Sequence, residues 1–367
     1  MAFKFITPRD GDMLTNAAGL VQDNSLLIEV TLSGNENASV TVNGVKAVWD
    51  GVCFKAIVQL DSYCNTLTAV CSCGAEEKIA VYWLKNAAKK FALSVDDNIW
   101  AFADLTKNQD KYTSIFDNAY LNVYKQAHDR YGTTVRLNMF YEMDNQCGLD
   151  LYGPFNLSMM TEKFKDEFKA NSDWLRLAFH AHSEFPDWPY TNASYEKMKA
   201  DYEKIAREII RFAGEESFEG ACTTNHFGSG TREAVQAERE LGMKALMGYL
   251  ELTEKGDSFV SYYLSPAEVV HANEYGFWKD HSADMIYGKI DAVLNLYTKE
   301  QIIDRLDRAK ALYPKKGFIE VMIHEQYFYP TYVRYIPEYA ELIFTACKWC
   351  RDNGYEPAFT SEVLCAE

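Results

Sequence analysis

The chain has no apolar run long enough to span a bilayer and a clear deficit of positive charge. No segment approaches the roughly 20 consecutive apolar residues that a membrane span needs. The opening residues, MAFKFITPRDG, lack the charged head, apolar stretch and small-residue cleavage site of a signal peptide, which favours a cytoplasmic protein. Lysine and arginine number 37 against 53 acidic residues, giving a net charge of -16. This balance argues against nucleic acid and anionic membranes as partners.

Cysteine forms no regular framework. Nine cysteines are an odd number, which fits free thiols in a reducing compartment better than a set of disulfides. The two close pairs, Cys71 with Cys73 and Cys347 with Cys350, have no evident second half that would supply four converging zinc ligands. We therefore expect no structural zinc site built from cysteine.

The 367 residues are enough for a large domain with an appendage. Residues 3–84 contain short apolar or alternating stretches separated by turn residues such as Asn43-Gly44 and Asp50-Gly51. Strands at this spacing, with no helix signal, predict a small immunoglobulin-like β-sandwich over residues 1–87. It shows no catalytic residue pattern, so we expect a structural role beside the larger domain, with sugar binding as the less favoured alternative.

From residue 88 onward the pattern changes to alternating strands and helices. Predicted strands, among them residues 220–226, 289–296 and a last one near 357–363, alternate with predicted helices up to the end of the chain. One of these helices, at 266–275, has Ser265 as its expected cap. Seven or eight such units over residues 88–367 predict an α/β fold, a distorted (β/α) barrel. In barrels of this kind the chemistry lies at the carboxyl ends of the strands, so polar residues there are the candidate site residues.

The first of these strands, residues 89–98, ends on two adjacent carboxylates. Phe91, Leu93 and Val95 alternate with smaller residues, so Asp96 is expected to point into the barrel and Asp97 to lie at the rim. Two neighbouring like charges are unfavourable unless a cation or a proton separates their roles. The alternative is a helix N-cap followed by a solvated acid.

Four of the seven histidines follow predicted strands. His180 and His182 close the third strand, His226 ends the fourth and His324 ends a late one, while Glu184 lies just after the third strand. The other three histidines fall on predicted helices or loops. Imidazoles and carboxylates gathered at one rim suit one catalytic divalent ion such as Zn²⁺, Co²⁺, Mn²⁺ or Fe²⁺. A single histidine at a strand end would more often be a packed residue.

These motifs resemble those of the polysaccharide deacetylase family of carbohydrate esterases. The matching stretches are Ser94-Val-Asp96-Asp97-Asn98, Phe179-His180-Ala-His182-Ser183-Glu184, Thr224-Asn-His226-Phe-Gly228 and Met322-Ile-His324. The resemblance implies that Asp96 is the general base and His324 the general acid. It implies that Asp97, His180 and His182 bind the metal, with Glu184 or His226 as alternative ligands. The family's arginine, which orients the base, is absent from the third stretch.

The resemblance implies hydrolysis of N- or O-acetyl groups on a carbohydrate or another acetylated small molecule by metal-activated water. Asp291 is a candidate partner that would hold His324 charged. Trp100, Trp188 and Tyr327 lie in predicted rim loops and could stack on a sugar. Two alternatives stay open: a metal-dependent amidohydrolase, and a degenerate barrel that binds glycan without cleaving it. The sequence predicts neither the metal's identity nor the oligomeric state.

Overall fold

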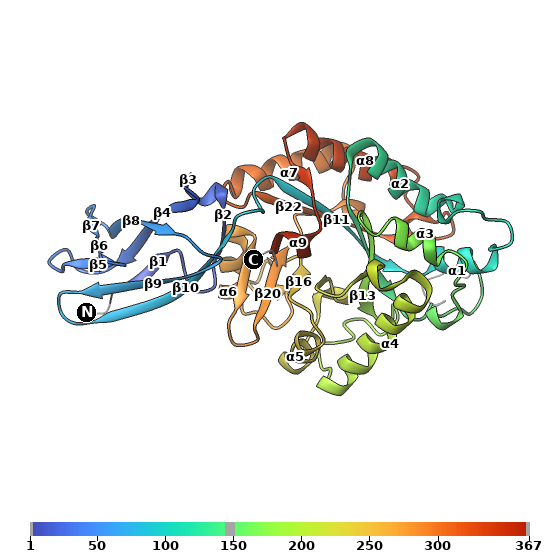
Figure 1. The fold of residues 1–367 in the computed structure, drawn as a ribbon, viewed down its shortest axis with the longest axis horizontal. Coiled ribbons are helices and arrows are strands. Elements are labelled where there is room, and N and C mark those ends of the chain that lie inside the picture. Colours follow the sequence, from blue (N-terminus) through green and yellow to red (C-terminus); the bar gives the residue numbers. More distant parts are fainter. Residues whose placement is uncertain (1–2, 144–150, 365–367) are drawn as a thin grey trace.

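The computed structural model describes residues 3–143 and 151–364. Its first strands form two five-stranded sheets that extend away from the rest of the molecule (Figure 1). One sheet comprises β1 (Lys4–Thr7), β3 (Leu20–Gln22), β4 (Ser25–Ser33), β7 (Val48–Trp49) and β8 (Phe54–Leu60). The other comprises β2 (Met13–Thr15), β5 (Val40–Val42), β6 (Val45–Lys46), β9 (Cys64–Cys71) and β10 (Glu76–Leu84).

Alternation of buried and exposed residues explains why these two sheets pack together. Along β8 every second side chain, from Phe54 to Leu60, is buried. These residues join one apolar core with the inward faces of β4, β9 and β10. Asn43 and Gly44 both have positive φ and connect β5 to β6, which is the hairpin turn that the Asn-Gly pair predicts.

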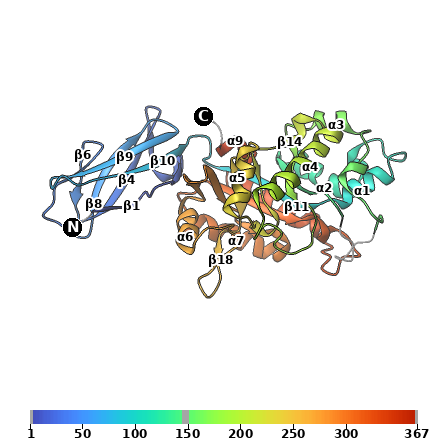
Figure 2. The ribbon, with the colours of Figure 1, turned by 90° about the horizontal axis from the view of Figure 1, so that it is seen from below.

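The β-rich part contacts the larger part through β2, which packs against β19 (Phe277–Asp280) and α6 (Pro266–Tyr275). Figure 2 shows the β-rich part as a separate lobe on the side of α6. Gly11 has φ +83°, and a Cβ added there would lie 2.3 Å from the backbone oxygen of Lys279, so only glycine fits. The Gly11 carbonyl accepts a hydrogen bond from the Lys279 N–H at 2.9 Å, and the Trp278 indole donates to the Asp10 carbonyl at 3.0 Å. Backbone contacts therefore fix the junction.

Parallel strands form the centre of the larger part. A seven-stranded sheet comprises β14 (Phe218–Glu219), β13 (Leu175–Ala181), β12 (Val135–Phe140), β11 (Lys90–Asn98), β22 (Phe318–His324) and β21 (Ala292–Val293), with β23 (Glu356–Pro357) beside β11. A second sheet comprises β15 (Cys222–Thr223), β16 (Ala245–Gly248), β20 (Met285–Lys289) and the antiparallel β19 (Phe277–Asp280). A short hairpin, β17 (Glu251–Leu252) and β18 (Ser258–Phe259), projects from it.

The strand order follows the chain, as predicted, but the strands form two sheets instead of one closed ring. The chain leaves the first sheet between β14 and β15, at residues 220–221. It returns between β20 and β21, at residues 290–291. No ladder joins the two sheets within residues 3–143 and 151–364. The predicted strand at 220–226 therefore contains only β15, whereas the predicted strand at 289–296 contains the last residue of β20 and all of β21, which belong to different sheets.

Helices cover the strands on the outside. They are α1 (Trp100–Lys107), α2 (Ala119–Tyr131), α3 (Lys165–Ala170), α4 (Tyr195–Ala213), α5 (Arg232–Glu240), α6 (Pro266–Tyr275), α7 (Lys299–Leu312), α8 (Tyr339–Asp352) and α9 (Thr360–Leu364). Ser265 caps α6 through a capping box with Glu268, as the Ser-Pro start predicts. The strand predicted at the end of the chain is wrong apart from β23, because α9 follows.

The cysteines and the lengths of the helices can be compared with the expectations from the sequence. None of the seven cysteines in the described ranges forms a disulfide bond. Among the helices the structure describes, none combines the length and the apolar character needed to cross a bilayer.

Candidate metal centre

Both carboxylates at the end of β11 point into one cavity. Between Val95 and Asn98, β11 holds one more residue than its neighbour β12, which is a β-bulge. Asp97 adopts φ +66°, a conformation that non-glycine residues rarely take and that recurs at functional sites. Asp97 is therefore buried beside Asp96 inside the cavity, so the predicted rim position of Asp97 is wrong.

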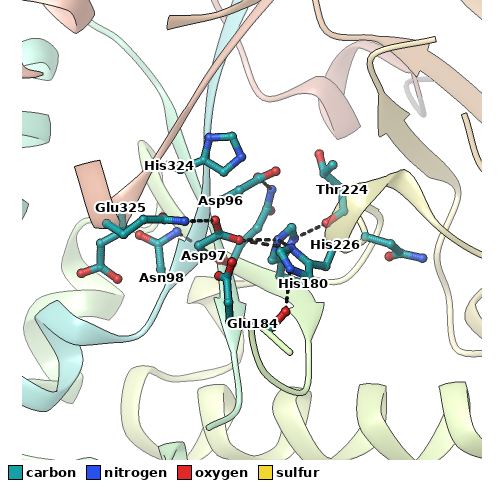
Figure 3. A network of polar contacts seen from close by, with 12 residues as sticks. Asp96, Asp97, Asn98, His180, Glu184, Thr224, His226, His324 and Glu325 are labelled. Atoms are coloured by element: carbon teal, nitrogen blue, oxygen red, sulfur yellow. Dashed lines mark hydrogen bonds and ion pairs between the residues drawn. The ribbon is translucent and has the colours of Figure 1, made fainter. Parts of the chain in front are cut away.

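The side chains of Asp97, His180 and His226 converge on one point (Figure 3). Asp97 Oδ1 lies 3.0 Å from His180 Nε2 and 3.3 Å from His226 Nδ1. The two ring nitrogens are 3.1 Å apart. His180 lies near the end of β13, and His226 follows β15, so three separate strand ends supply these atoms.

The outer hydrogen bonds of the two histidines determine where their lone pairs point. His180 Nδ1 contacts the Thr224 carbonyl oxygen at 2.5 Å, and His226 Nε2 contacts the Glu184 carbonyl oxygen at 3.0 Å. A carbonyl oxygen only accepts, so each of these ring nitrogens carries the proton. In the neutral rings, His180 Nε2 and His226 Nδ1 are then both acceptors that face the Asp97 carboxylate. Three acceptors in contact need a cation between them, which is either a proton on one of the rings or a metal ion.

The spacing and chemistry of this set fit a divalent metal. Ligand atoms about 2.0–2.1 Å from a tetrahedrally coordinated ion lie about 3.3 Å from one another, which is close to the distances observed among these three atoms. Two imidazoles and a carboxylate leave a fourth position for water, as in catalytic zinc sites. Backbone carbonyls that hold the second nitrogen of each ring are the usual outer partners of metal-binding histidines. Asp97, His180 and His226 could therefore hold one ion.

Asp97 stays ionised in this setting. Burial favours the neutral acid, but the hydrogen bonds with His180 and His226 outweigh that effect, and the pKa of Asp97 lies well below its ordinary value. Gln326 also donates to Asp97 Oδ2 at 2.7 Å. A carboxylate that is charged and fixed on both oxygens is suited to binding a cation.

Asp96 lies beside these three residues and is held by a series of hydrogen bonds between buried polar side chains. Asn138 Nδ2 donates to Asp96 Oδ1 at 2.6 Å, and Arg136 Nε donates to Asn138 Oδ1 at 3.1 Å. Arg136 also pairs with Glu320 at 2.8 Å, where both side chains are almost fully buried. Asp96 thus receives a fixed donor from β12, although the third sequence stretch lacks an arginine.

His324 is the register partner of Asp96 on the neighbouring strand β22. Its Nδ1 lies 2.9 Å from the side-chain oxygen of Asn295, and the ring lines the same cavity as Asp96. The predicted partner of His324, Asp291, instead accepts hydrogen bonds from Lys316 Nζ at 2.5 Å and from the Glu320 N–H. Asn295 therefore takes the place expected for Asp291.

Three predicted site residues do not belong to the cluster of Asp97, His180 and His226. His182 Nε2 lies 3.2 Å from a Glu142 carboxylate oxygen, away from the cluster. A register shift between β12 and β13 at His180 ends the simple alternation, so His182 no longer shares the face of His180. Glu184 lines the cavity, but its contact with the cluster is through its backbone carbonyl. Trp100 is fully buried at the start of α1 and cannot form a rim surface.

Glu325 and Gln326, which directly follow His324, were not predicted as site residues. The carboxylate of Glu325 accepts the N–H groups of Ile99, Trp100 and Ala101 at 2.5–3.1 Å, at the N-terminus of α1. This contact joins the end of β22 to residues two to four positions after Asp97. Gln326 then reaches Asp97 itself. The sequence does show two polar residues directly after a strand end, but the residues they bind lie more than 220 positions away in the chain.

The cavity above the cluster has a volume of about 410 Å³ and aromatic walls. Its lining residues include Trp188, Phe227, Tyr249, Phe259, Tyr327 and Tyr332. Trp188 stacks on Phe227 at 4.8 Å and is 39% exposed, so one edge of this wall is open to solvent. The volume falls within the roughly 300–1,000 Å³ of small-molecule sites.

Comparisons with known proteins give only distant likenesses. No family model and no curated sequence matches this chain. A CE4 family pseudoenzyme from Bacillus anthracis has 12% identity and a TM-score of 0.41, with 76% of this chain and 66% of that chain covered. A family 4 acetyl xylan esterase from Clostridium thermocellum, in complex with a cobalt ion, has 10% identity and a TM-score of 0.38, with 76% and 91% covered.

A 4-alpha-glucanotransferase from Thermococcus litoralis has 10% identity and a TM-score of 0.45, with 76% of this chain but 40% of that chain covered. TM-scores below 0.5 do not establish a common fold. The function must therefore be inferred from the geometry of the site itself.

Proposed function

We propose that this protein is a metal-dependent hydrolase that removes N- or O-acetyl groups from carbohydrates. The observation that carries the proposal is the convergence of Asp97, His180 and His226 on one point, where two imidazole nitrogens and a carboxylate oxygen lie 3.0–3.3 Å from one another. The resemblance of the sequence motifs to polysaccharide deacetylases supports the same reaction. The two sheets, with strand order following the chain, are consistent with a distorted barrel of that family.

A divalent ion bound by these three residues would polarise the acetyl carbonyl and lower the pKa of a bound water. Asp96, the neighbour of Asp97, would accept the proton of that water. Asn138 fixes the Asp96 carboxylate by donating to Oδ1, leaving Oδ2 for the proton. His324 lies next to Asp96 on β22 and would donate a proton to the departing amine or alcohol.

The open aromatic edge supplies a surface for a sugar ring. Trp188 and Tyr327 line the cavity and would contact the substrate, whereas Trp100 is fully buried and would not. We assign the residues before 88 an auxiliary role, because the catalytic candidates all lie after them.

The experiment is to load the protein with Zn²⁺ or Co²⁺ and measure bound metal and released acetate in parallel. Acetylated xylan, chitin oligosaccharides and peptidoglycan fragments serve as substrates, and Asp97→Ala is the matched variant. We expect about one ion per chain and acetate release that Asp97→Ala abolishes. Bound metal without release from any substrate would favour the glycan-binding alternative, and protein that takes up no metal would refute the proposal.

A further inference from the structure

A second cavity lies where the chain passes from β20 in one sheet to β21 in the other. Its volume of about 720 Å³ falls within the roughly 300–1,000 Å³ of small-molecule sites. Its lining comes from β17, α6, the end of β20, α7 and the residues that follow α7. It shares no lining residue with the cavity at the candidate metal centre, so the proposed hydrolysis does not use it.

The ammonium group of Lys289 belongs to a buried side chain that lines this cavity. Its Nζ donates a hydrogen bond to the Tyr249 carbonyl oxygen at 2.5 Å. Among the described carboxylates only that of Glu251 lies within 4 Å, and its distance of 3.6 Å from Nζ is too long for a hydrogen bond. Burial lowers the pKa of Lys289 to about 8. Because an ammonium group has three N–H donors, an anion in the cavity would stabilise it.

Two arginines of α7 line the same cavity. Arg305 Nε donates to the Asp291 carbonyl oxygen at 2.8 Å, and Arg305 Nη2 donates to Glu251 Oε1 at 2.9 Å. These bonds fix the guanidinium through Nε and Nη2, and its remaining nitrogen, Nη1, takes part in neither of them. Arg308, three positions further along the helix, is exposed and forms no ion pair with a carboxylate in the described part of the chain. Both guanidinium groups therefore have donors available to a ligand.

The acids of the lining do not cancel these charges. The Glu251 carboxylate is paired with the first arginine, and Asp291 Oδ2 is paired with the buried Lys316 Nζ at 2.5 Å. Glu274 is the third acid, whereas Lys315 adds a further cation. The lining is thus net positive, although the whole chain carries a charge of -16. Salt screens distant acids beyond about 8–10 Å, so the groups at the cavity decide which ions it attracts.

The cavity also has an apolar part. Leu252, Val270 and Leu312 are exposed side chains that line it, and they come from β17, α6 and α7. Single exposed apolar residues are ordinary, but apolar residues gathered at a cavity with a few polar groups are typical of ligand sites. The ligand that matches this lining has an apolar body and an anionic end.

We propose that this second cavity binds a small phosphate monoester, with its organic part against the apolar residues. Lys289, Arg305 and Arg308 would bind the phosphate. A phosphate monoester has three acceptor oxygens and nearly two negative charges at neutral pH, so it suits three cationic groups better than a carboxylate does. The proposal is independent of the proposed function, because it involves neither the metal ligands nor the residues assigned to acetyl removal.

The test is a calorimetric titration of the protein with phenyl phosphate, inorganic phosphate and phenol. Lys289→Gln and Arg308→Gln are the test variants, and Arg308→Gln changes an exposed side chain, so it decides the matter even if loss of the buried lysine prevents folding. Lys310→Gln is the matched control, because Lys310 is an exposed cation on the same helix that donates to Asn353 and does not line the cavity. Asp97→Ala tests whether the phosphate binds at the metal centre instead.

We expect phenyl phosphate to bind about tenfold more tightly than inorganic phosphate, and phenol to show no measurable binding. Arg308→Gln should weaken the binding of phenyl phosphate about fivefold, and Lys289→Gln at least about tenfold. Lys310→Gln and Asp97→Ala should leave the affinity within about twofold of the wild-type value, and raised salt should weaken binding.

Absence of phenyl phosphate binding, equal binding of phenol or of inorganic phosphate, or an affinity that Arg308→Gln leaves unchanged would overturn the inference. Loss of binding in Asp97→Ala would place the phosphate at the metal centre and would overturn it as well. Failure of the proposed function is recognised separately, by the absence of bound metal and of acetate release, neither of which enters this titration.

Discussion

Glu238, on α5 beneath the site, should make the protein less stable as the pH rises from 5 to 8. Its side chain is fully buried, and no ion pair with a described lysine or arginine compensates it. Burial raises the pKa of Glu238 from 4.5 to about 8, against a smaller opposing effect of Asn225. Asn225 directly precedes His226, so this acid lies under one of the candidate metal ligands.

The sign follows from proton binding. Between pH 4.5 and 8 the folded protein keeps a proton on Glu238 that the unfolded chain has lost, so the free energy of unfolding falls as the pH rises. Above pH 8 both states are ionised and this dependence ends. A shift from 4.5 to about 8 corresponds to about 5 kcal/mol in full, of which about 3 to 4 kcal/mol is lost between pH 5 and 8.

Glu238→Gln keeps the shape and removes the titration. Urea unfolding of both proteins at pH 5, 6, 7 and 8 should therefore show a difference that grows with pH in favour of the variant. Glu233→Gln, an exposed position on the same helix, is the control and should show no such trend. If the two proteins lose stability in parallel from pH 5 to 8, then Glu238 is not a buried acid with a raised pKa.

The remaining predictions concern the site. Asn138→Asp replaces the donor to Asp96 with a second carboxylate, so the rate of acetate release should fall about 100-fold while zinc affinity measured by titration stays within about threefold. A comparable loss of zinc affinity would contradict the separate role of Asn138. Trp188→Ala should weaken binding of an acetylated chitin oligosaccharide while the urea midpoint changes little. Trp100→Ala, in contrast, should cost about 3–5 kcal/mol of stability, and a rim role for Trp100 would instead leave the midpoint unchanged.

Hydropathy and turn residues predicted much of the fold. The Asn43-Gly44 turn and the Ser265 cap form as expected because they depend on residues close in the chain. The exchange of strands between two sheets at residues 220–221 and 290–291 could not be predicted. This exchange depends on pairing between segments that are distant in the sequence. A short apolar strand has the same sequence pattern whichever of the two sheets it joins.

The candidate site was predicted in its residue types more than in its geometry. Polar residues at strand ends identified Asp96, Asp97, His180, His226 and His324. The bulges in β11 and β13 leave no mark in the hydrophobic pattern, since one extra residue simply shifts the alternation. For that reason the rim position predicted for Asp97 was wrong, and His182 does not lie beside His180 as a second metal ligand.

The choice between His226 and His182 as the second imidazole is the most direct test of the account. Zinc titrations would compare the wild-type protein with Asp97→Ala, His180→Ala, His226→Ala and His182→Ala. We expect about one site in the wild-type protein, a loss of affinity of at least about 100-fold in the first three variants, and a change within about threefold in His182→Ala. Zinc binding that survives in His226→Ala but is lost in His182→Ala would contradict the account.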